Sequence, residues 1–286
     1  MAIKLILLDV DGTLATSQKQ ISPDTKAALL KVQEGGVKLA LCSGRPDRGL
    51  YPWAEELRMT EYGGFFVCYN GGRVLDCRTG KVLFDQPLPI EDAKAVLEHM
   101  RRFQVMPMVS RGEYMYVTDV FRHDIRPGLP GFPEIFNVMR YEARGNGYLL
   151  CEKRDLAAFL DFSPNKILTY GDPCYLREHW REMAEPFAER LACMFTAPFY
   201  FEFTAKGVDK ARAIDSALSP LGYAPSEMMA FGDAQNDVSM LRYAGLGVAM
   251  GNAVDEVRQL ADEVTASNDE DGIARSLYKH LPELFR

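Results

Sequence analysis

Two aspartates separated by one residue, Asp9 and Asp11, follow an apolar run and precede a glycine. Carboxylates this close repel one another unless a cation or a shared proton offsets the repulsion. Two further acids, Asp233 and Asp237, follow another apolar run near the far end of the chain. Oxygen ligands with no histidine or cysteine beside them suit Mg²⁺ rather than zinc. The sequence therefore predicts a magnesium site to which both ends of the chain contribute.

Groups of the opposite chemistry occur at comparable places. Ser43 and Gly44 follow the apolar run 37–42, and Lys210 begins a predicted helix. A hydroxyl and a backbone N–H can donate to phosphate oxygens, and an ammonium meets phosphate as a point charge. Acids, metal, hydroxyl and lysine together predict a phosphoryl-transfer site. Mg²⁺ and Lys210 would screen the dianion so that Asp9 can approach phosphorus.

A parallel α/β sheet is the element predicted to position these groups. Residues 3–8 are almost continuously apolar, which is typical of a strand covered on both faces. A helix that starts at Ser22-Pro23 and the apolar run 37–42 complete a βαβ unit, and residues 227–250 repeat strand, helix and strand. Ligands of such sheets bind beyond the carboxyl ends of the strands, where all four polar segments stand. We predict a Rossmann-like parallel-sheet core with helices on both faces.

The middle of the chain differs from its two ends in composition and in the pattern of its predicted elements. Prolines are frequent there, and strand-like stretches such as 114–117 and 199–203 alternate with loops. We therefore expect an inserted α+β cap domain over residues 85–204, and a catalytic core formed by residues 1–84 and 205–286. The phenylalanines at 199, 201 and 203 are predicted to pack inside the protein.

Composition limits the class of protein. The 286 residues carry 33 Lys+Arg and 40 Asp+Glu, a net charge of −7 that argues against a nucleic-acid binder. No apolar run approaches the length of a membrane span, and the first one is too short for a signal peptide. The six cysteines form no C-x-x-C pair and are predicted to be buried thiols in a reducing cytoplasm. We expect a cytoplasmic enzyme with a small phosphorylated metabolite as its partner and neither nucleic acid nor membrane. The sequence does not indicate the oligomeric state.

Four motifs in order resemble those of the haloacid dehalogenase-like phosphatase superfamily, in its Cof-type branch. They are Asp-x-Asp-Gly-Thr-Leu at 9–14, Ser-Gly-Arg at 43–45, Gly-Val-x-Lys at 207–210 and Gly-Asp-x-x-Asn-Asp at 232–237. The resemblance covers the whole chain, with the large insertion after the second motif. It implies that Asp9 is the nucleophile, forming an aspartyl-phosphate, and that Asp11 protonates the leaving group and then activates water. We expect the anionic neighbours of Asp11 to raise its pKa.

The resemblance also implies the remaining roles. The magnesium ligands would be Asp9, the backbone carbonyl of Asp11, and Asp233. The groups that hold the phosphoryl oxygens would be Ser43, Gly44 and Lys210. Asp237 would orient water or Lys210 from behind the metal, and Asn236 would touch phosphate or substrate. The cap would close over small substrates.

The expected function is Mg²⁺-dependent hydrolysis of small phosphate monoesters, with sugar phosphates first and phosphorylated cofactors such as pyridoxal phosphate left open. One alternative is a phosphosugar mutase resembling phosphomannomutase, and another is a receiver-like module that accepts phosphate without turning over. Several residues keep two interpretations. Asp233 and Asp237 could merely cap a helix, and other residues could lie in the site or on an ordinary surface or turn: Arg45, Lys206, Asn70, and in the insertion Arg111, Tyr116, Arg122, His123, Arg126 and Lys166.

Overall fold

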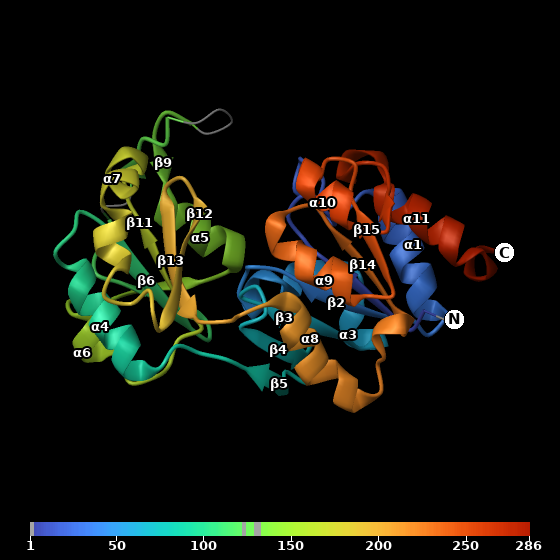
Figure 1. Ribbon diagram of the computed structural model, residues 1–286, viewed down its shortest axis with the longest axis horizontal. Helices are drawn as coiled ribbons and strands as arrows, with labels where there is room; N and C mark the ends of the chain where they lie inside the picture. The colour runs from blue at the N-terminus through green and yellow to red at the C-terminus, as the bar shows by residue number, and fades with distance from the viewer. Residues whose placement is uncertain (1–2, 122–123, 129–132) are drawn as a thin grey trace. The chain divides into compact units, whose positions relative to one another are not determined.

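The computed structural model describes residues 3–121, 124–128 and 133–286. The chain forms two compact units, which Figure 1 shows. The core unit comprises the chain up to Asp85 and from Asp209 onward, and the inserted unit runs from Gln86 to Val208. The return to the core lies a few residues beyond position 204, because the last strand of the inserted unit continues to Ala205.

A single sheet forms the centre of the core unit. Within the described residues it has eight strands in the order β16-β15-β14-β1-β2-β3-β4-β5. Their bounds are β1 Leu5–Leu8, β2 Lys38–Cys42, β3 Gly64–Cys68, β4 Arg73–Asp76, β5 Val82–Asp85, β14 Met228–Gly232, β15 Leu246–Ala249 and β16 Glu263–Val264. Strands β16 to β3 are parallel, but β4 and β5 pair antiparallel. The sheet is therefore mixed rather than wholly parallel. The change of direction occurs because a tight turn joins β3 to β4, so that β4 runs back beside β3.

Helices cover both faces of this sheet. One face carries α1 (Pro23–Glu34), α2 (Tyr51–Glu56), α3 (Met59–Tyr62) and α11 (Gly272–His280), and the other carries α8 (Lys210–Leu218), α9 (Val238–Tyr243) and α10 (Asp255–Leu260). Alternate residues of β1 serve the two layers: Ile6 packs toward the first group and Leu7 toward the second. Helix α1 begins as the sequence predicts, with the Ser22 side chain accepting from the N–H of Thr25.

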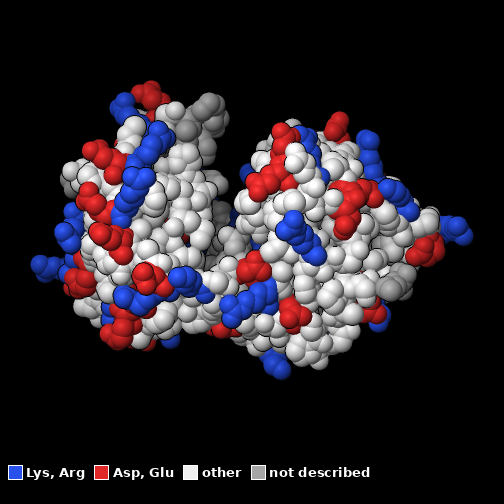
Figure 2. Space-filling view, viewed as in Figure 1, with Lys and Arg blue, Asp and Glu red and all other residues white. Residues whose placement is uncertain are grey.

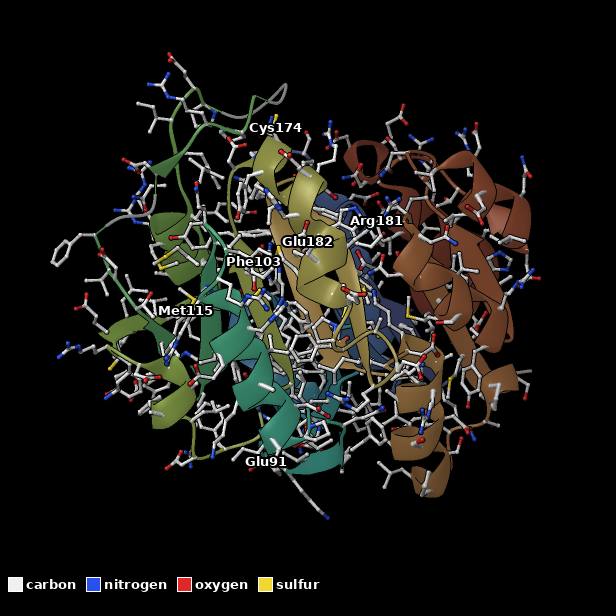
Figure 3. The ribbon with its side chains drawn as sticks, turned by 60° about the vertical axis from the view of Figure 1, so that its left-hand side comes forward. Glu91, Phe103, Met115, Cys174, Arg181 and Glu182 are labelled. Carbon is white, nitrogen blue, oxygen red and sulfur yellow. The ribbon has the colours of Figure 1, made fainter. Side chains whose placement is uncertain are left out.

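The inserted unit is an α+β domain built on a second sheet. Its strands are β6 Met106–Arg111, β7 Tyr114–Val117, β10 Leu149–Glu152, β11 Lys166–Tyr170, β12 Leu191–Ala197 and β13 Tyr200–Ala205, with a separate pair β8 Asp124–Ile125 and β9 Phe136–Asn137. Its helices are α4 Ile90–Met100, α5 Val138–Asn146, α6 Leu156–Phe159 and α7 Pro173–Ala184. Helices α4 and α7 lie in front of the sheet in Figure 3, where Phe103 stands between them. Phe201 and Phe203 pack beneath these helices, and Phe199 packs with α5 on the other face.

The structure bears on three features that composition raised: the distribution of charge, the burial of the cysteines and the length of apolar helices. On the face drawn in Figure 2, acidic and basic side chains are interspersed over both units. Cys42, Cys68 and Cys77 are buried free thiols, but Cys174 is exposed at the start of α7, so the prediction that all six are buried is wrong. Among the helices of the described residues, none has the length and apolar character needed to cross a membrane.

Candidate active site

The sheet brings three of the predicted segments to one edge of the core unit. Strands β14, β1 and β2 are adjacent and parallel, so the residues that follow them, Asp233, Asp9 and Ser43, lie at neighbouring strand ends. The N–H of Asp9 donates to the carbonyl of Phe231 at 3.1 Å, which extends the pairing to the site itself. Helix α8 supplies the fourth segment, because Lys210 is its first residue.

Lys210 is the electrostatic centre of this site. Its side chain is fully buried, and Nζ lies 2.8 Å from Asp9 Oδ1, 2.6 Å from Asp237 Oδ1 and 2.9 Å from the carbonyl oxygen of Cys42. These contacts use all three donors of the ammonium. Burial opposes its charge, but Asp237 and Asp9 raise the pKa of Lys210 above its ordinary value. Lys206 lies elsewhere, donating to the carbonyl of Glu189 in the inserted unit.

Three carboxylates form a candidate metal centre around the ammonium. One oxygen from each of Asp9, Asp233 and Asp237 lies within 4.8 Å of the other two. Three acids against the single ammonium of Lys210 leave an excess of negative charge in a poorly hydrated place, and oxygen donors of this kind fit a hard divalent cation. Among the described residues the Asp11 carboxylate is not part of this group.

The pKa values of the acids reflect the same excess of negative charge. Burial, followed by the charge of Asp237, raises the pKa of Asp9 well above its ordinary value, although Lys210 opposes the shift. Burial also raises the pKa of Asp233 to about 6, with the charge of Asp237 adding to the effect and a hydrogen bond from Thr13 opposing it. A bound cation would stabilise the ionised form of both carboxylates. Protons and a metal ion would therefore compete for this site.

The carboxylate of Asp237 accepts hydrogen bonds both from the backbone and from Lys210. Its Oδ2 accepts from the N–H groups of Asp233 and Ala234, both at 3.1 Å, while its Oδ1 accepts from Lys210. Asp237 therefore does cap the turn before α9, as one interpretation of the sequence had it, and it also fixes the ammonium. Asp233 is held differently, by the Thr13 hydroxyl at 2.6 Å.

The Asp11 side chain points to cations instead of the acid cluster. Arg45 donates from Nε to Oδ2 at 2.7 Å and from Nη2 to Oδ1 at 2.8 Å, and Lys19 Nζ lies 2.9 Å from Oδ1. Burial raises the pKa of Asp11, but the hydrogen bonds and charges of Arg45 and Lys19 outweigh it and lower the pKa to about 2. The expectation that anionic neighbours raise this pKa is wrong for that reason. Of the two interpretations left open for Arg45, the structure shows an ion pair with Asp11, a residue of the predicted site.

The turn after β3 contributes residues for which the sequence left two interpretations. The Asn70 N–H donates to the carbonyl of Ser43 at 2.9 Å, and its Oδ1 accepts from Asn236 Nδ2 at 3.0 Å. Tyr69 and Asn70 both have left-handed backbones, with φ of 54° and 56°. Left-handed residues other than glycine are concentrated at functional sites. Thr13 was not singled out from the sequence, although it stands inside the first motif.

The candidates of the inserted unit are paired within that unit. Arg111 contacts Asp161, and Lys166 donates to Glu202 at 2.9 Å. Arg126 contacts Glu134, and the ring of Tyr116 packs against that of Phe159 in a tilted arrangement. Arg122 and His123 lie outside the described residues.

Known proteins resemble this chain along its whole length. A family of haloacid dehalogenase-like hydrolases matches residues 6–277. A haloacid dehalogenase-like hydrolase from Bacteroides thetaiotaomicron is 32% identical, with a TM-score of 0.87 over 97% of this chain and 99% of the other. The sugar phosphatase BT4131, of subclass IIB, is 25% identical with a TM-score of 0.75 over 98% and 99%. The pyridoxal phosphate phosphatase YbhA of Escherichia coli is 27% identical over 98% of this chain and 100% of its own length. The chain thus belongs to the haloacid dehalogenase-like hydrolases, within their Cof-type phosphatase branch, as its motifs predict.

Proposed function

We propose that this chain is a Mg²⁺-dependent phosphatase that hydrolyses small phosphate monoesters through an aspartyl-phosphate on Asp9. The observation that carries the proposal is the buried ion cluster. In it the Lys210 ammonium joins Asp9 to Asp237, and Asp233 adds a third carboxylate within 4.8 Å. Asp9 and Asp233 would hold the metal, together with the backbone carbonyl of Asp11. A divalent cation bound there would attract the phosphoryl oxygens toward the acids and would neutralise part of the negative charge on those oxygens.

The first step is attack on phosphorus by an oxygen of Asp9. The bond from phosphorus to the leaving oxygen breaks, and Asp11 gives its proton to that oxygen. Lys210 keeps the nucleophile ionised, because its hydrogen bond to Oδ1 stabilises the carboxylate at a place where burial raises the pKa. Ser43, the N–H of Gly44 and Asn236 are the proposed donors to the phosphoryl oxygens.

The second step returns Asp9 to its free form. Water attacks phosphorus, Asp11 takes the proton from the water, and the bond from the Asp9 oxygen to phosphorus breaks to release phosphate. Arg45 and Lys19 hold Asp11 as a carboxylate, which is the base that this step requires. The first step needs the protonated acid. The Asp11 carboxylate must therefore break its two hydrogen bonds with Arg45 and take up a proton before it can protonate the leaving oxygen.

Two substrate classes are suggested by relatives of this chain. BT4131 is a sugar phosphatase and YbhA is a pyridoxal phosphate phosphatase, so both classes are candidates for this chain. We place sugar phosphates first and propose that residues of the inserted unit determine selectivity. A panel of phosphorylated metabolites assayed with Mg²⁺ identifies the substrate by the highest kcat/KM.

Hydrolysis of p-nitrophenyl phosphate tests the proposal directly. The wild-type protein is expected to release phosphate over many turnovers with Mg²⁺ and to stop with EDTA. Asp9→Asn is expected to lower kcat by roughly 10³-fold or more, because it removes the nucleophile. Asp215→Asn, a change of an exposed acid that hydrogen-bonds Ser219 and Tyr243, is the matched control and should keep full activity. Normal turnover by Asp9→Asn overturns the assignment.

The same assay separates the alternatives. A receiver-like module would take up one phosphate per chain and then stop. A mutase would convert a hexose phosphate to its isomer when a bisphosphate activator is supplied, and it would release little free phosphate. Steady release of phosphate without isomerised product supports the phosphatase.

A further inference from the structure

Two asparagines outside the four motifs hold the loop that follows Asp9. Asn252 Nδ2 donates to the carbonyl oxygen of Gly12 at 2.8 Å, and Asn268 Nδ2 donates to that of Ala15, also at 2.8 Å. The two are joined, because the Asn268 N–H donates to Asn252 Oδ1 at 3.0 Å. A single hydrogen-bonded network thus fixes two carbonyls of this loop.

The turn that carries Asn252 is also attached to the segment of Asp233. The N–H of Met250 donates to the carbonyl of Gly232 at 3.0 Å, and the N–H of Val254 donates to that of Asp233 at 3.2 Å. Asn252 lies between these two anchors. Its side chain therefore links the backbone of one metal-site segment to the backbone of the other.

Gly12 stands directly against the Asp233 carboxylate. Its φ of +90° favours glycine, and a Cβ built there would lie 2.5 Å from Asp233 Oδ2. The next residue, Thr13, donates its hydroxyl to Asp233 Oδ1 at 2.6 Å. A displacement of Gly12 would therefore move the hydroxyl that orients Asp233, and with it the distance from this carboxylate to Asp9.

We propose that Asn252 is a positioning residue for the metal centre. By fixing the carbonyl of Gly12, it keeps the Thr13 hydroxyl on Asp233 and so places this carboxylate for Mg²⁺. The inference rests on the proposed function, since it takes Asp233 as a metal ligand. Removing a group that supports a metal ligand typically weakens metal binding by 10- to 100-fold. Asn252 is exposed, so its truncation leaves the packed core intact.

Titration of the substrate-free full chain with Mg²⁺ by calorimetry tests this role without an activity assay. Asn252→Ala is expected to raise the Kd for Mg²⁺ by about tenfold, with an unchanged melting temperature in EDTA. Gln235→Ala is the matched control: it removes an exposed amide two positions from Asp233 that hydrogen-bonds Glu256, and should leave the Kd unchanged. A wild-type Kd in Asn252→Ala overturns the inference. Asn268→Ala, which keeps the N–H donated to Asn252, should raise the Kd less.

A double-mutant cycle tests the route through the loop. Thr13→Val removes the hydroxyl from Asp233 at nearly constant volume. If Asn252 acts through Thr13, the combined variant weakens binding by less than the product of the two single effects, whereas full additivity overturns this route. Asp233→Asn separates the two proposals. If it binds Mg²⁺ as the wild type does, the metal site and this inference both fail. If it loses binding while Asn252→Ala keeps it, only the inference fails.

Discussion

Arg45 binds both carboxylate oxygens of Asp11, with Nε 2.7 Å from Oδ2 and Nη2 2.8 Å from Oδ1. A forked, charge-assisted contact of this kind is among the stronger hydrogen-bonding arrangements in proteins. It has a consequence for catalysis, because the same carboxylate is the proposed acid of the first step and the proposed base of the second. Arg45 favours the base.

The pH profile is expected to change in Arg45→Ala. Loss of the guanidinium raises the pKa of Asp11 from about 2 toward its ordinary 3.8, so the acid form persists to higher pH. Since kcat/KM reports the ionisation of the free enzyme, its decline on the alkaline side should move up by about one pH unit. Kinetics with p-nitrophenyl phosphate measure this shift. Arg58→Ala, which removes an exposed arginine paired with Glu61, is the control, and a profile in Arg45→Ala identical to it would contradict the prediction.

Lys210→Met is expected to destabilise the fold as well as abolish activity. The substitution leaves Asp9 and Asp237 buried without their shared cation, which typically costs about 3–5 kcal/mol. Because Lys210 lowers the pKa of Asp9, its loss raises that pKa further, and the folded variant then binds a proton more readily than the unfolded chain. The variant should therefore regain stability as the pH falls. Urea denaturation across pH checks both effects, and Lys210→Met/Asp237→Asn should recover part of the loss.

The metal-free protein is expected to lose stability as the pH rises from about 4 through about 6. The folded pKa of Asp233 is about 6, above the ordinary 3.8, so its contribution to stability is complete below the lower value and is lost through the upper one. Because this side chain is partly exposed, solvent screening limits the effect to about 1 kcal/mol. Asp233→Asn should remove that part of the pH dependence and be more stable than the wild type at pH 7 in EDTA. Equal slopes for the two proteins would rule this out.

Magnesium should reverse the order of stability at neutral pH. A ligand that binds only the folded state stabilises it in proportion to the logarithm of its concentration over Kd. Wild-type protein is expected to gain in melting temperature with added Mg²⁺, whereas Asp233→Asn gains little. The gain should shrink below pH 6, where protons compete with the metal for Asp233. A constant gain from pH 5 to 8 would show that the metal binds elsewhere.

The arrangement of the core follows from local patterns in the sequence. The apolar run that becomes β1 is buried on both faces, and Ser22 caps α1 as its type and position predict. Parallel neighbours then bring strand ends together, so the meeting of Asp9 with Asp233 follows from topology. Strands β4 and β5 were not predicted, because β5 is short and partly exposed and lacks the continuous apolar character of a buried strand.

Side-chain direction within the site could not be predicted from the chain alone. Asp9 and Asp11 are two positions apart, but one meets Lys210 and the other meets Arg45. That choice depends on the backbone of the loop, which hydrogen bonds from distant Asn252 and Asn268 fix. Contacts separated by more than two hundred positions leave no signal in local spacing. The predicted rise in the pKa of Asp11 was wrong for a related reason, because the spacing of the acids does not show that Arg45 and Lys19 reach this carboxylate.

Asn70 offers a test in which backbone strain and side-chain function separate. Its left-handed φ of 56° suits glycine, so Asn70→Gly should keep the stability of the wild type to within about 1 kcal/mol. Asn70→Val places a β-branched residue at positive φ and should cost about 2 kcal/mol more. Both variants remove the Asn70 oxygen that accepts from the Asn236 amide. If the Asn236 amide positions phosphate, both variants are expected to lower kcat/KM by about tenfold. Urea denaturation and steady-state kinetics on the pair distinguish the two effects. Wild-type kcat/KM in Asn70→Gly would show that the Asn70 amide has no part in catalysis, since the strain-free variant loses nothing else.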